Sequence, residues 1–261
     1  MDRQGREDDQ LGDRSGDDPA MPENRLAHQI HVWRTSTDLK TPRLRALWST
    51  LSTDERKRAE RFRFPRDRQW FIARRGLLRA ILGRYLGAEA RELRFSYGRF
   101  GKPAVASGPD RPALEFNLSH SAGLALVALT AQEGVGIDIE RIDAHTDYRD
   151  VAVNFFSAQD SEELLRTPPA QARRVFFRLW SMREAVGKAR GDGLAVFDQR
   201  HPDTAAGESE PMWGCSATEL DITHGYAAAL ALRGPWKLRP SPWRGRFDEW
   251  EACCCVALEI C

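Results

Sequence analysis

The chain has 261 residues, of which 41% are hydrophobic, and its 39 lysines and arginines nearly balance its 38 aspartates and glutamates. This length and composition allow one large domain or two small ones with a sizeable core. The balanced net charge does not indicate a particular class of binding partner. No apolar run approaches the roughly 18 residues of a membrane helix, and no apolar segment indicates a secretory signal. The five cysteines show no zinc-ligand spacing and no disulfide framework, so we expect the protein to be located in the reducing cytoplasm.

The first half of the chain predicts helices followed by strands. Residues 1–24 are polar and rich in Asp, Arg and Gly, and we expect them to form a disordered tail. A short strand is expected at 30–33, and Ser52-Thr-Asp-Glu55 resembles a capping box that opens a basic helix. From Asp67 to Leu86 apolar side chains recur at helical spacing, which predicts a long amphipathic helix. Further strands are expected at 93–96, 113–117 and 123–129, with a turn at 99–103 and a connecting segment at 118–122.

The second half repeats this order. After a strand at 134–141, helices are expected at 147–156, at 157–165 with Ser157 as N-cap, and at 171–189. A strand from Phe197, a polar loop at 201–211 and two strands within 213–232 complete it. The segment after Pro235, with Cys253–Cys255 and Cys261, has no clear interpretation and is a tail or an added strand.

The repeated order predicts an α+β fold made of two similar halves that face each other, with a ligand cleft between them. The predicted organisation is a tail at 1–24, an N-terminal half at 25–130, a C-terminal half at 131–235 and a C-terminal tail at 236–261.

Two acids stand out in the strand Gly134–Arg141. Because side chains alternate along a strand, Ile137 and Ile139 are expected to face a core, and Asp138 and Glu140 the opposite side. Adjacent like charges need an offsetting partner, and Mg2+ with oxygen ligands would provide one. An exposed strand edge with solvated acids remains an equally good interpretation.

Three further groups each have a structural and a functional interpretation. Glu184 and Lys188 share a helix face and form either a surface ion pair or part of a site. The arginine-rich helices around Arg58 and Arg75 suit a solvated face, nucleic acid or the phosphates of a small ligand. Ser119-His120 is more typical of a structural histidine than of a catalytic one, and no Walker loop or hydrolase elbow accompanies it.

The order and spacing of these motifs are specific. The segment Gly136-Ile-Asp-Ile-Glu140 is followed about forty residues later by Trp180-Ser-Met-Arg-Glu-Ala185 and Lys188. This arrangement resembles the signature of the 4'-phosphopantetheinyl transferases, in their long, single-chain form. Other matching stretches, within a resemblance that covers roughly residues 30–233, are Arg75–Arg79, Gly101–Pro103, Asn117–Ser121, Phe156-Ser157 and Gly191–Leu194.

The resemblance implies that the two α+β halves are related by a pseudo-twofold axis, and it implies a role for each motif. Coenzyme A would lie in the cleft, and Mg2+ or Mn2+ would be held by Asp138, Glu140 and Glu184. The implied coenzyme A contacts are Arg75, His120 and Arg58 at the 3'-phosphate, Lys102 and Pro103 at the adenine, and Ser119 at the phosphates. Lys188 would stabilise the departing group, and Glu184 would be the general base, directly or through a water on the metal. Arg183 stands where the family commonly has lysine, and it would take up developing charge.

The implied activity is transfer of 4'-phosphopantetheine to a serine of an apo acyl, peptidyl or polyketide carrier protein, with release of adenosine 3',5'-bisphosphate. The resemblance also implies a monomer that binds neither nucleic acid nor membrane. Two other classes remain open: a non-enzymatic basic module that binds nucleic acid or an acidic protein, and a metal-dependent phosphohydrolase.

Overall fold

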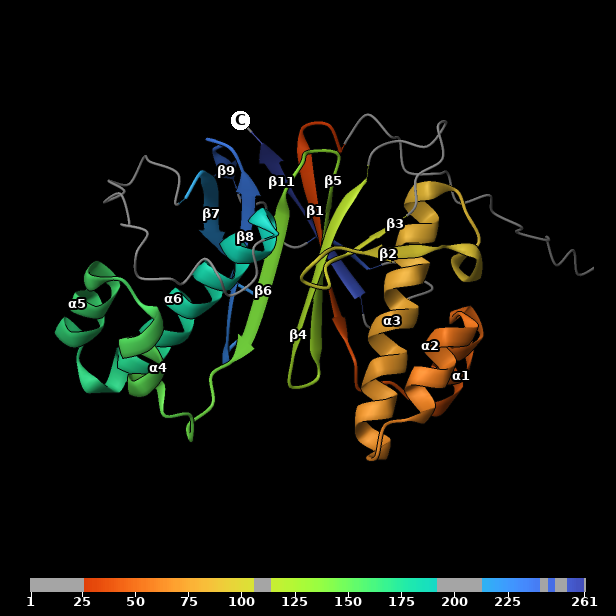
Figure 1. Cartoon of the computed structure of the whole chain (residues 1–261), viewed down its shortest axis with the longest axis horizontal. Coiled ribbons are helices and arrows are strands. Elements are labelled where there is room, and N and C mark those ends of the chain that lie inside the picture. The colour runs from red at the N-terminus through yellow and green to blue at the C-terminus, as the bar shows by residue number, and fades with distance from the viewer. Residues whose placement is uncertain (1–25, 106–113, 192–212, 240–243, 247–252, 261) are drawn as a thin grey trace, which may run out of the picture.

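A computed structural model describes residues 26–105, 114–191, 213–239, 244–246 and 253–260. The expected N-terminal tail, the strand from Phe197 and the loop at 201–211 lie outside these residues. The described chain is an α+β fold in which two antiparallel sheets lie face to face, with helices on both outer sides (Figure 1). No helix in the described ranges is long and apolar enough to cross a membrane.

The larger sheet belongs mainly to the N-terminal half. Its strand order is β10-β11-β1-β5-β4, and β9 pairs with β11. Its bounds are β1 Gln29–Ser36, β4 Glu115–Ser121, β5 Leu124–Thr130, β9 Leu238–Arg239, β10 Arg244–Arg246 and β11 Cys253–Ile260. The helices α1 Thr41–Thr50, α2 Thr53–Glu60 and α3 Pro65–Leu86 cover its outer face, and the 3-10 turn η2 Ala90–Glu92 leads to a hairpin of β2 Phe95–Tyr97 and β3 Pro103–Val105.

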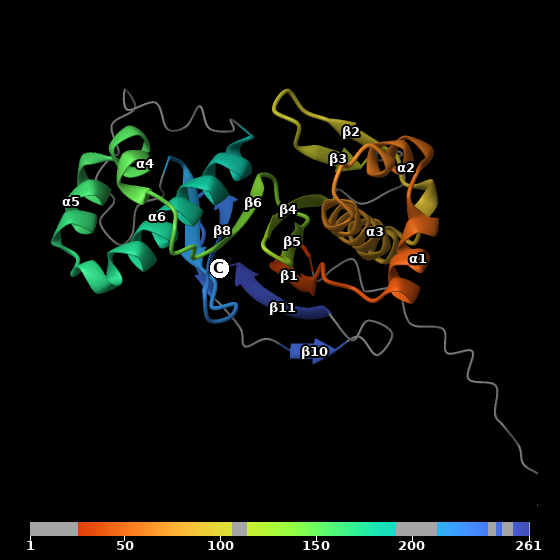
Figure 2. The same cartoon turned by 90° about the horizontal axis from the view of Figure 1, so that it is seen from below.

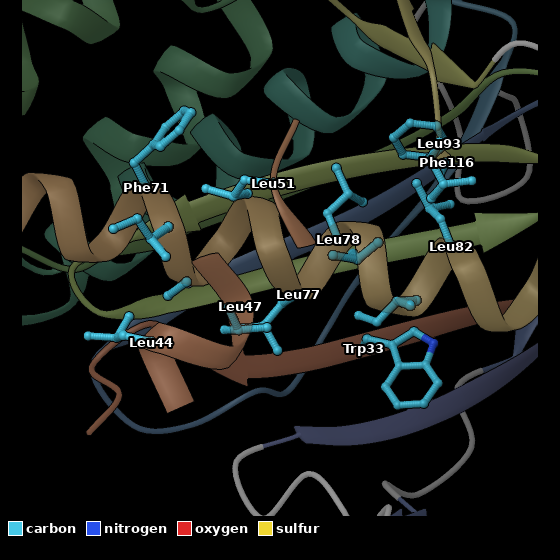
Figure 3. Close-up of a cluster of buried hydrophobic side chains, with 14 of the residues drawn as sticks. Trp33, Leu44, Leu47, Leu51, Phe71, Leu77, Leu78, Leu82, Leu93 and Phe116 are labelled. Atoms are coloured by element: carbon cyan, nitrogen blue, oxygen red, sulfur yellow. The ribbon is translucent and has the colours of Figure 1, made fainter. Parts of the chain in front are cut away.

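The long helix α3 is the main support of this half. Pro65 begins it and Gly87, in the left-handed conformation, ends it, as expected for an N1 proline and a C-cap glycine. Its apolar side chains pack on those of α1, β1 and β4, and Trp33 and Phe116 belong to the same buried cluster (Figure 3). Gly76 brings α3 close to α1, because a Cβ there would lie 2.7 Å from Cβ of Leu47.

The C-terminal half has a smaller sheet of order β6-β8-β7, with β6 Val135–Arg141, β7 Cys215–Glu219 and β8 Tyr226–Arg233. The helix α6 Pro169–Arg190 covers its outer face, and α4 Tyr148–Phe155 and α5 Ala158–Arg166 pack on the first turns of α6. Ser157 caps α5 as expected, since its side chain accepts the N–H of Asp160. Like α3, α6 begins with a proline and ends at a left-handed glycine, Gly191.

The end of the chain belongs to the core. Strand β11 pairs with β1 over its length, from Gln29 opposite Glu259 to Thr35 opposite Cys253. Val256 and Leu258 are buried between the two sheets, in the same cluster as Ile137. The segment that the sequence left open is therefore an added strand (Figure 2).

One expected element is wrong in a way that matters for the site. The sequence predicted a connecting segment at 118–122, but β4 continues to Ser121, and only Ala122 and Gly123 turn, both with positive φ. Short hydroxyl side chains suit this strand because they bond to the neighbouring strand β6.

Candidate active site

The two halves meet where β4 lies beside β6, in both views of the molecule (Figures 1 and 2). Strands β4 and β6 belong to different sheets, and side chains join them. At every second residue a side-chain oxygen of β4 accepts a backbone N–H of β6. We call this row of three hydrogen bonds the polar seam. Its bonds run from Ile137 N–H to Asn117 Oδ1 at 3.0 Å, from Ile139 N–H to Ser119 Oγ at 3.4 Å and from Arg141 N–H to Ser121 Oγ at 3.0 Å.

Two lysines bond to backbone carbonyl groups of β6. Lys102 Nζ donates to the carbonyl of Val135 at 2.9 Å, and Lys188 Nζ donates to that of Ile137 at 3.3 Å. Lys102 comes from β2–β3 and Lys188 from α6, so each half contributes one cation to the seam. Positive charge is thereby placed beside the acidic strand.

Asp138 lies at the centre of the seam. Its Oδ1 accepts from Ser119 Oγ at 2.9 Å and from Lys188 Nζ at 2.6 Å, whereas its Oδ2 is buried and has no hydrogen-bond partner. The sequence placed this carboxylate on an exposed face, but only 2% of Asp138 is exposed, because α6 covers that face. Gly136 allows this approach, since a Cβ there would lie 2.0 Å from the carbonyl oxygen of Ala185.

The two other acids are electrostatically coupled to Asp138. Burial and then the charge of Asp138 raise the pKa of Glu140 to about 7, although Ser121 and Lys188 act in the opposite direction. Burial also raises the pKa of Glu184, and Asp138 adds to this while Lys188 opposes it. The acids predicted from β6 and α6 therefore share one negative field, which one lysine offsets only in part.

The donor set fits a hard cation, but the described side chains do not form a ready metal site. Within the described ranges, no three His, Cys, Asp or Glu residues are grouped so that they could hold a metal ion. Lys188 instead contacts Asp138 directly. The buried, unpartnered Oδ2 of Asp138 and the neighbouring carboxylates of Glu140 and Glu184 nevertheless provide the all-oxygen chemistry that Mg2+ requires.

A cationic group lies on the other side of β4. Because strand side chains alternate, His120 faces away from β6, and it contacts Arg74 of α3 through its Nε2. Burial, and then the charges of Arg58 and Arg75, lower the pKa of Arg74 to about 10. Burial and Arg74 likewise lower the pKa of His120. Arg74 was not among the residues singled out from the sequence, because adjacent arginines on a helix give no signal of which one faces β4.

Arg75, which the sequence singled out, has a different set of contacts. It forms an ion pair with Glu55, donates to the hydroxyl of Tyr97 at 2.6 Å and lies over the ring of Phe95. Glu55 is buried and also pairs with Arg79 at 2.5 Å. Burial raises the pKa of Glu55, but the two arginines outweigh this, and the pKa lies below its usual value. Arg75 and Arg79 therefore share the negative charge of Glu55, whereas Arg74 contacts His120.

Lys102 and Pro103 border a cavity of about 370 Å3 between the β2–β3 hairpin and the end of α6. Phe100 also lines it from the hairpin, and Gly134 and Arg190 line it from the C-terminal half. A cavity of this size, lined by two aromatic rings and several cations, suits part of a small ligand.

Arg183 contacts the acid of another helix and an aromatic ring. It is buried, its Nε donates to Asp160 Oδ2 at 2.7 Å, and its guanidinium lies 5.0 Å from the ring centre of Trp213. This contact joins α6 to α5. The structure thus brings Lys188 to the acids, whereas Arg183 has a structural environment.

The acids and Lys188 lie on one side of β4, and Arg74 and His120 lie on the other. Such an arrangement suits an enzyme that acts on phosphate groups, because phosphoryl transfer depends on positioning and charge neutralisation. Comparison with known proteins identifies the family. Residues 134–231 match the model of the 4'-phosphopantetheinyl transferase superfamily, and residues 33–132 match that of the 4'-phosphopantetheinyl transferase N-terminal region.

Similar proteins agree with this match. The 4'-phosphopantetheinyl transferase HetI of a Nostoc species is 38% identical over 214 residues, which cover 80% of this chain and 90% of HetI. The 4'-phosphopantetheinyl transferase Sfp of Bacillus subtilis is 31% identical over 194 residues, which cover 72% of this chain and 84% of Sfp. The chain belongs to the 4'-phosphopantetheinyl transferase superfamily.

Proposed function

We propose that this protein transfers the 4'-phosphopantetheine group of coenzyme A to a serine hydroxyl of an apo acyl, peptidyl or polyketide carrier protein. Family membership supports the reaction class. The observation that carries the proposal at the level of residues is the seam, where Asp138, Glu140 and Glu184 are coupled and Lys188 contacts Asp138.

The cationic group supports the binding of coenzyme A. Arg58 and Arg74 lie over the ring of Phe71, at 5.4 and 5.6 Å from its centre, and Arg74 contacts His120. Crowded cations repel one another, so an anion such as the 3'-phosphate would relieve the repulsion. Arg75 remains a candidate for the same phosphate, and Lys102 and Pro103 would border the adenine in the cavity beside the β2–β3 hairpin.

Asp138, Glu140 and Glu184 would hold Mg2+, for which Mn2+ could substitute. The unpartnered Oδ2 of Asp138 and the net negative field support this assignment. When bound, the metal supplies charge neutralisation for the pyrophosphate of coenzyme A.

The side chains suit an in-line transfer. The serine oxygen of the carrier forms a bond to the β-phosphorus as the bond from that phosphorus to the oxygen of adenosine 3',5'-bisphosphate breaks. Glu184 accepts the proton of the serine hydroxyl. Lys188, whose Nζ lies 2.6 Å from Asp138, stabilises or protonates the departing phosphate. One chain supplies both sides of the seam, which supports a monomer, and the absence of a disulfide framework among the cysteines supports a location in the cytoplasm.

The test is to incubate the protein with coenzyme A, Mg2+ and several apo carrier proteins, and to weigh the carriers by mass spectrometry. The proposal requires a mass increase of one 4'-phosphopantetheine group on at least one carrier, abolished by Glu184→Ala. Phosphate ester turnover without a carrier would favour a phosphohydrolase. Calorimetry that shows no binding of coenzyme A, with or without Mg2+, would favour a non-enzymatic basic module.

A further inference from the structure

The same pair of contacts occurs twice along the polar seam. Ser119 Oγ accepts the N–H of Ile139 and donates to Asp138 Oδ1. One strand repeat later, Ser121 Oγ accepts the N–H of Arg141 at 3.0 Å and donates to Glu140 Oε2 at 3.0 Å. Each serine of β4 therefore contacts one carboxylate of β6 and the backbone of the residue that follows it.

The hydrogen-bonding capacity of a hydroxyl determines which group donates and which accepts at each serine. A serine hydroxyl has one proton and two lone pairs, and the backbone N–H uses a lone pair. The serine proton is then free to form a hydrogen bond to one of the two oxygens of the carboxylate. In Asp138 the other oxygen is left without a hydrogen-bond partner. Such contacts fix the direction in which an acidic side chain presents its second oxygen to a ligand.

We propose that Ser121 is a positioning residue, which orients Glu140 for binding the metal. The inference rests on the proposed function, because it assumes that Glu140 is a metal ligand. Ser119 plays the same part for Asp138, but its Oγ also accepts from Lys188 Nζ at 3.2 Å. A change at Ser119 would alter several contacts together, so Ser121 is the residue to test.

The seam contains a natural control. Asn117 makes the third bond between β4 and β6, by accepting the N–H of Ile137 at 3.0 Å. The residue before Ile137 is Gly136, which has no side chain to orient. Asn117→Ala therefore removes a seam bond without removing a contact to an acid.

The experiment is calorimetric titration of Mg2+ into the full chain saturated with coenzyme A, combined with thermal unfolding. We expect Ser121→Ala to weaken Mg2+ binding by about tenfold, as is usual when a residue that orients a metal ligand is removed. Asn117→Ala should lower the unfolding temperature but leave the Mg2+ affinity unchanged. Because Ser121→Ala could also fail to fold, the isosteric pair Ser121→Thr and Ser121→Val provides a second comparison, in which only threonine keeps the hydroxyl.

The inference would be overturned by an Mg2+ affinity of Ser121→Ala equal to that of the wild type, or by an equal loss of affinity in Asn117→Ala. Equal affinities of the threonine and valine variants would do the same. A wild-type protein that binds coenzyme A without any response to Mg2+ would instead refute the metal assignment of the proposed function.

Discussion

The contact between Gly136 of β6 and α6 is the structural feature most open to a decisive test. In Gly136→Ala, the new Cβ would lie 2.0 Å from the carbonyl oxygen of Ala185 and 2.4 Å from the backbone nitrogen of Ala189. Ordinary contact begins at 3.4 Å, so α6 has to move away by 3.4 minus 2.0, or about 1.4 Å. Both contacts are to backbone, and no change of rotamer can relieve them.

The shift acts directly on the site because α6 carries Glu184 and Lys188. The bond of 2.6 Å between Lys188 Nζ and Asp138 would lengthen beyond hydrogen-bond range if the lysine moved with the helix. A displacement of about 1 Å can cost a reaction about a hundredfold in rate, and overpacking costs about 1–3 kcal/mol in stability. We therefore expect Gly136→Ala to fold, to melt at a lower temperature and to lose about 99% of its transfer rate.

The assay is the rate of apo-carrier conversion measured by mass spectrometry, with thermal unfolding followed by circular dichroism. Gly83→Ala is the matched control, since its Cβ would meet the carbonyl oxygen of Ala88 at 2.6 Å, at the far end of α3. It should lower the unfolding temperature but keep most of the activity. A Gly136→Ala protein with wild-type transfer rate would refute the argument that this close approach sets the position of α6.

Three other predictions follow from the N-terminal half and the C-terminal strand. Arg74→Ala should raise the Michaelis constant for coenzyme A at least about tenfold but barely affect 3'-dephospho-coenzyme A, because a hydrogen bond to a charged group contributes about 1.5–3 kcal/mol. Glu55→Gln should lower the free energy of unfolding at pH 7 by about 3–5 kcal/mol, because it leaves buried arginines without their acid. The folded-state pKa of Glu55 is lowered, so its stabilisation is present above the unfolded value and is lost as pH falls through the folded value. Leu258→Ala should cost about 2–5 kcal/mol, because this side chain is fully buried.

Each of these has its own measurement. Steady-state kinetics with coenzyme A and 3'-dephospho-coenzyme A test Arg74. An equal rise in the Michaelis constant for both coenzymes would exclude a contact between Arg74 and the 3'-phosphate. Arg75→Ala, measured in the same way, is the comparison variant. Urea unfolding from pH 7 down to pH 3 tests Glu55, and the difference between variant and wild type should shrink below about pH 4.5. Urea unfolding also tests Leu258, and a change below about 0.5 kcal/mol would mean that β11 adds little to the core.

The sequence predicted the helices and most strands because their signals are local. The apolar spacing from Asp67 to Leu86 and the proline and glycine limits of α6 belong to single elements, and the structure confirms both helices within a few residues. The alternation of Ile137, Asp138 and Ile139 also predicted correctly which side chains enter the core.

What the sequence missed depends on contacts between distant segments. Asp138 was expected on an exposed face, since nothing in its own strand shows that α6 would cover it. Glu55 was recognised as a capping residue, and its carboxylate does accept the N–H of Ser52 at 3.0 Å, but its pairing with Arg79 depends on tertiary packing. The environment of Arg183 similarly depends on where α5 places Asp160.

The position of β11 has a consequence for how the protein is made. The strand that pairs with β1, near the beginning of the described chain, is contributed by residues 253–260, which are synthesised after both halves. Until those residues leave the ribosome, β1 remains an edge strand with unpaired backbone groups, which can pair with other chains. We therefore expect the N-terminal half not to fold stably on its own. Expressed separately as residues 25–130, it should associate or be degraded, and supplying the remainder of the chain in the same cell should rescue it.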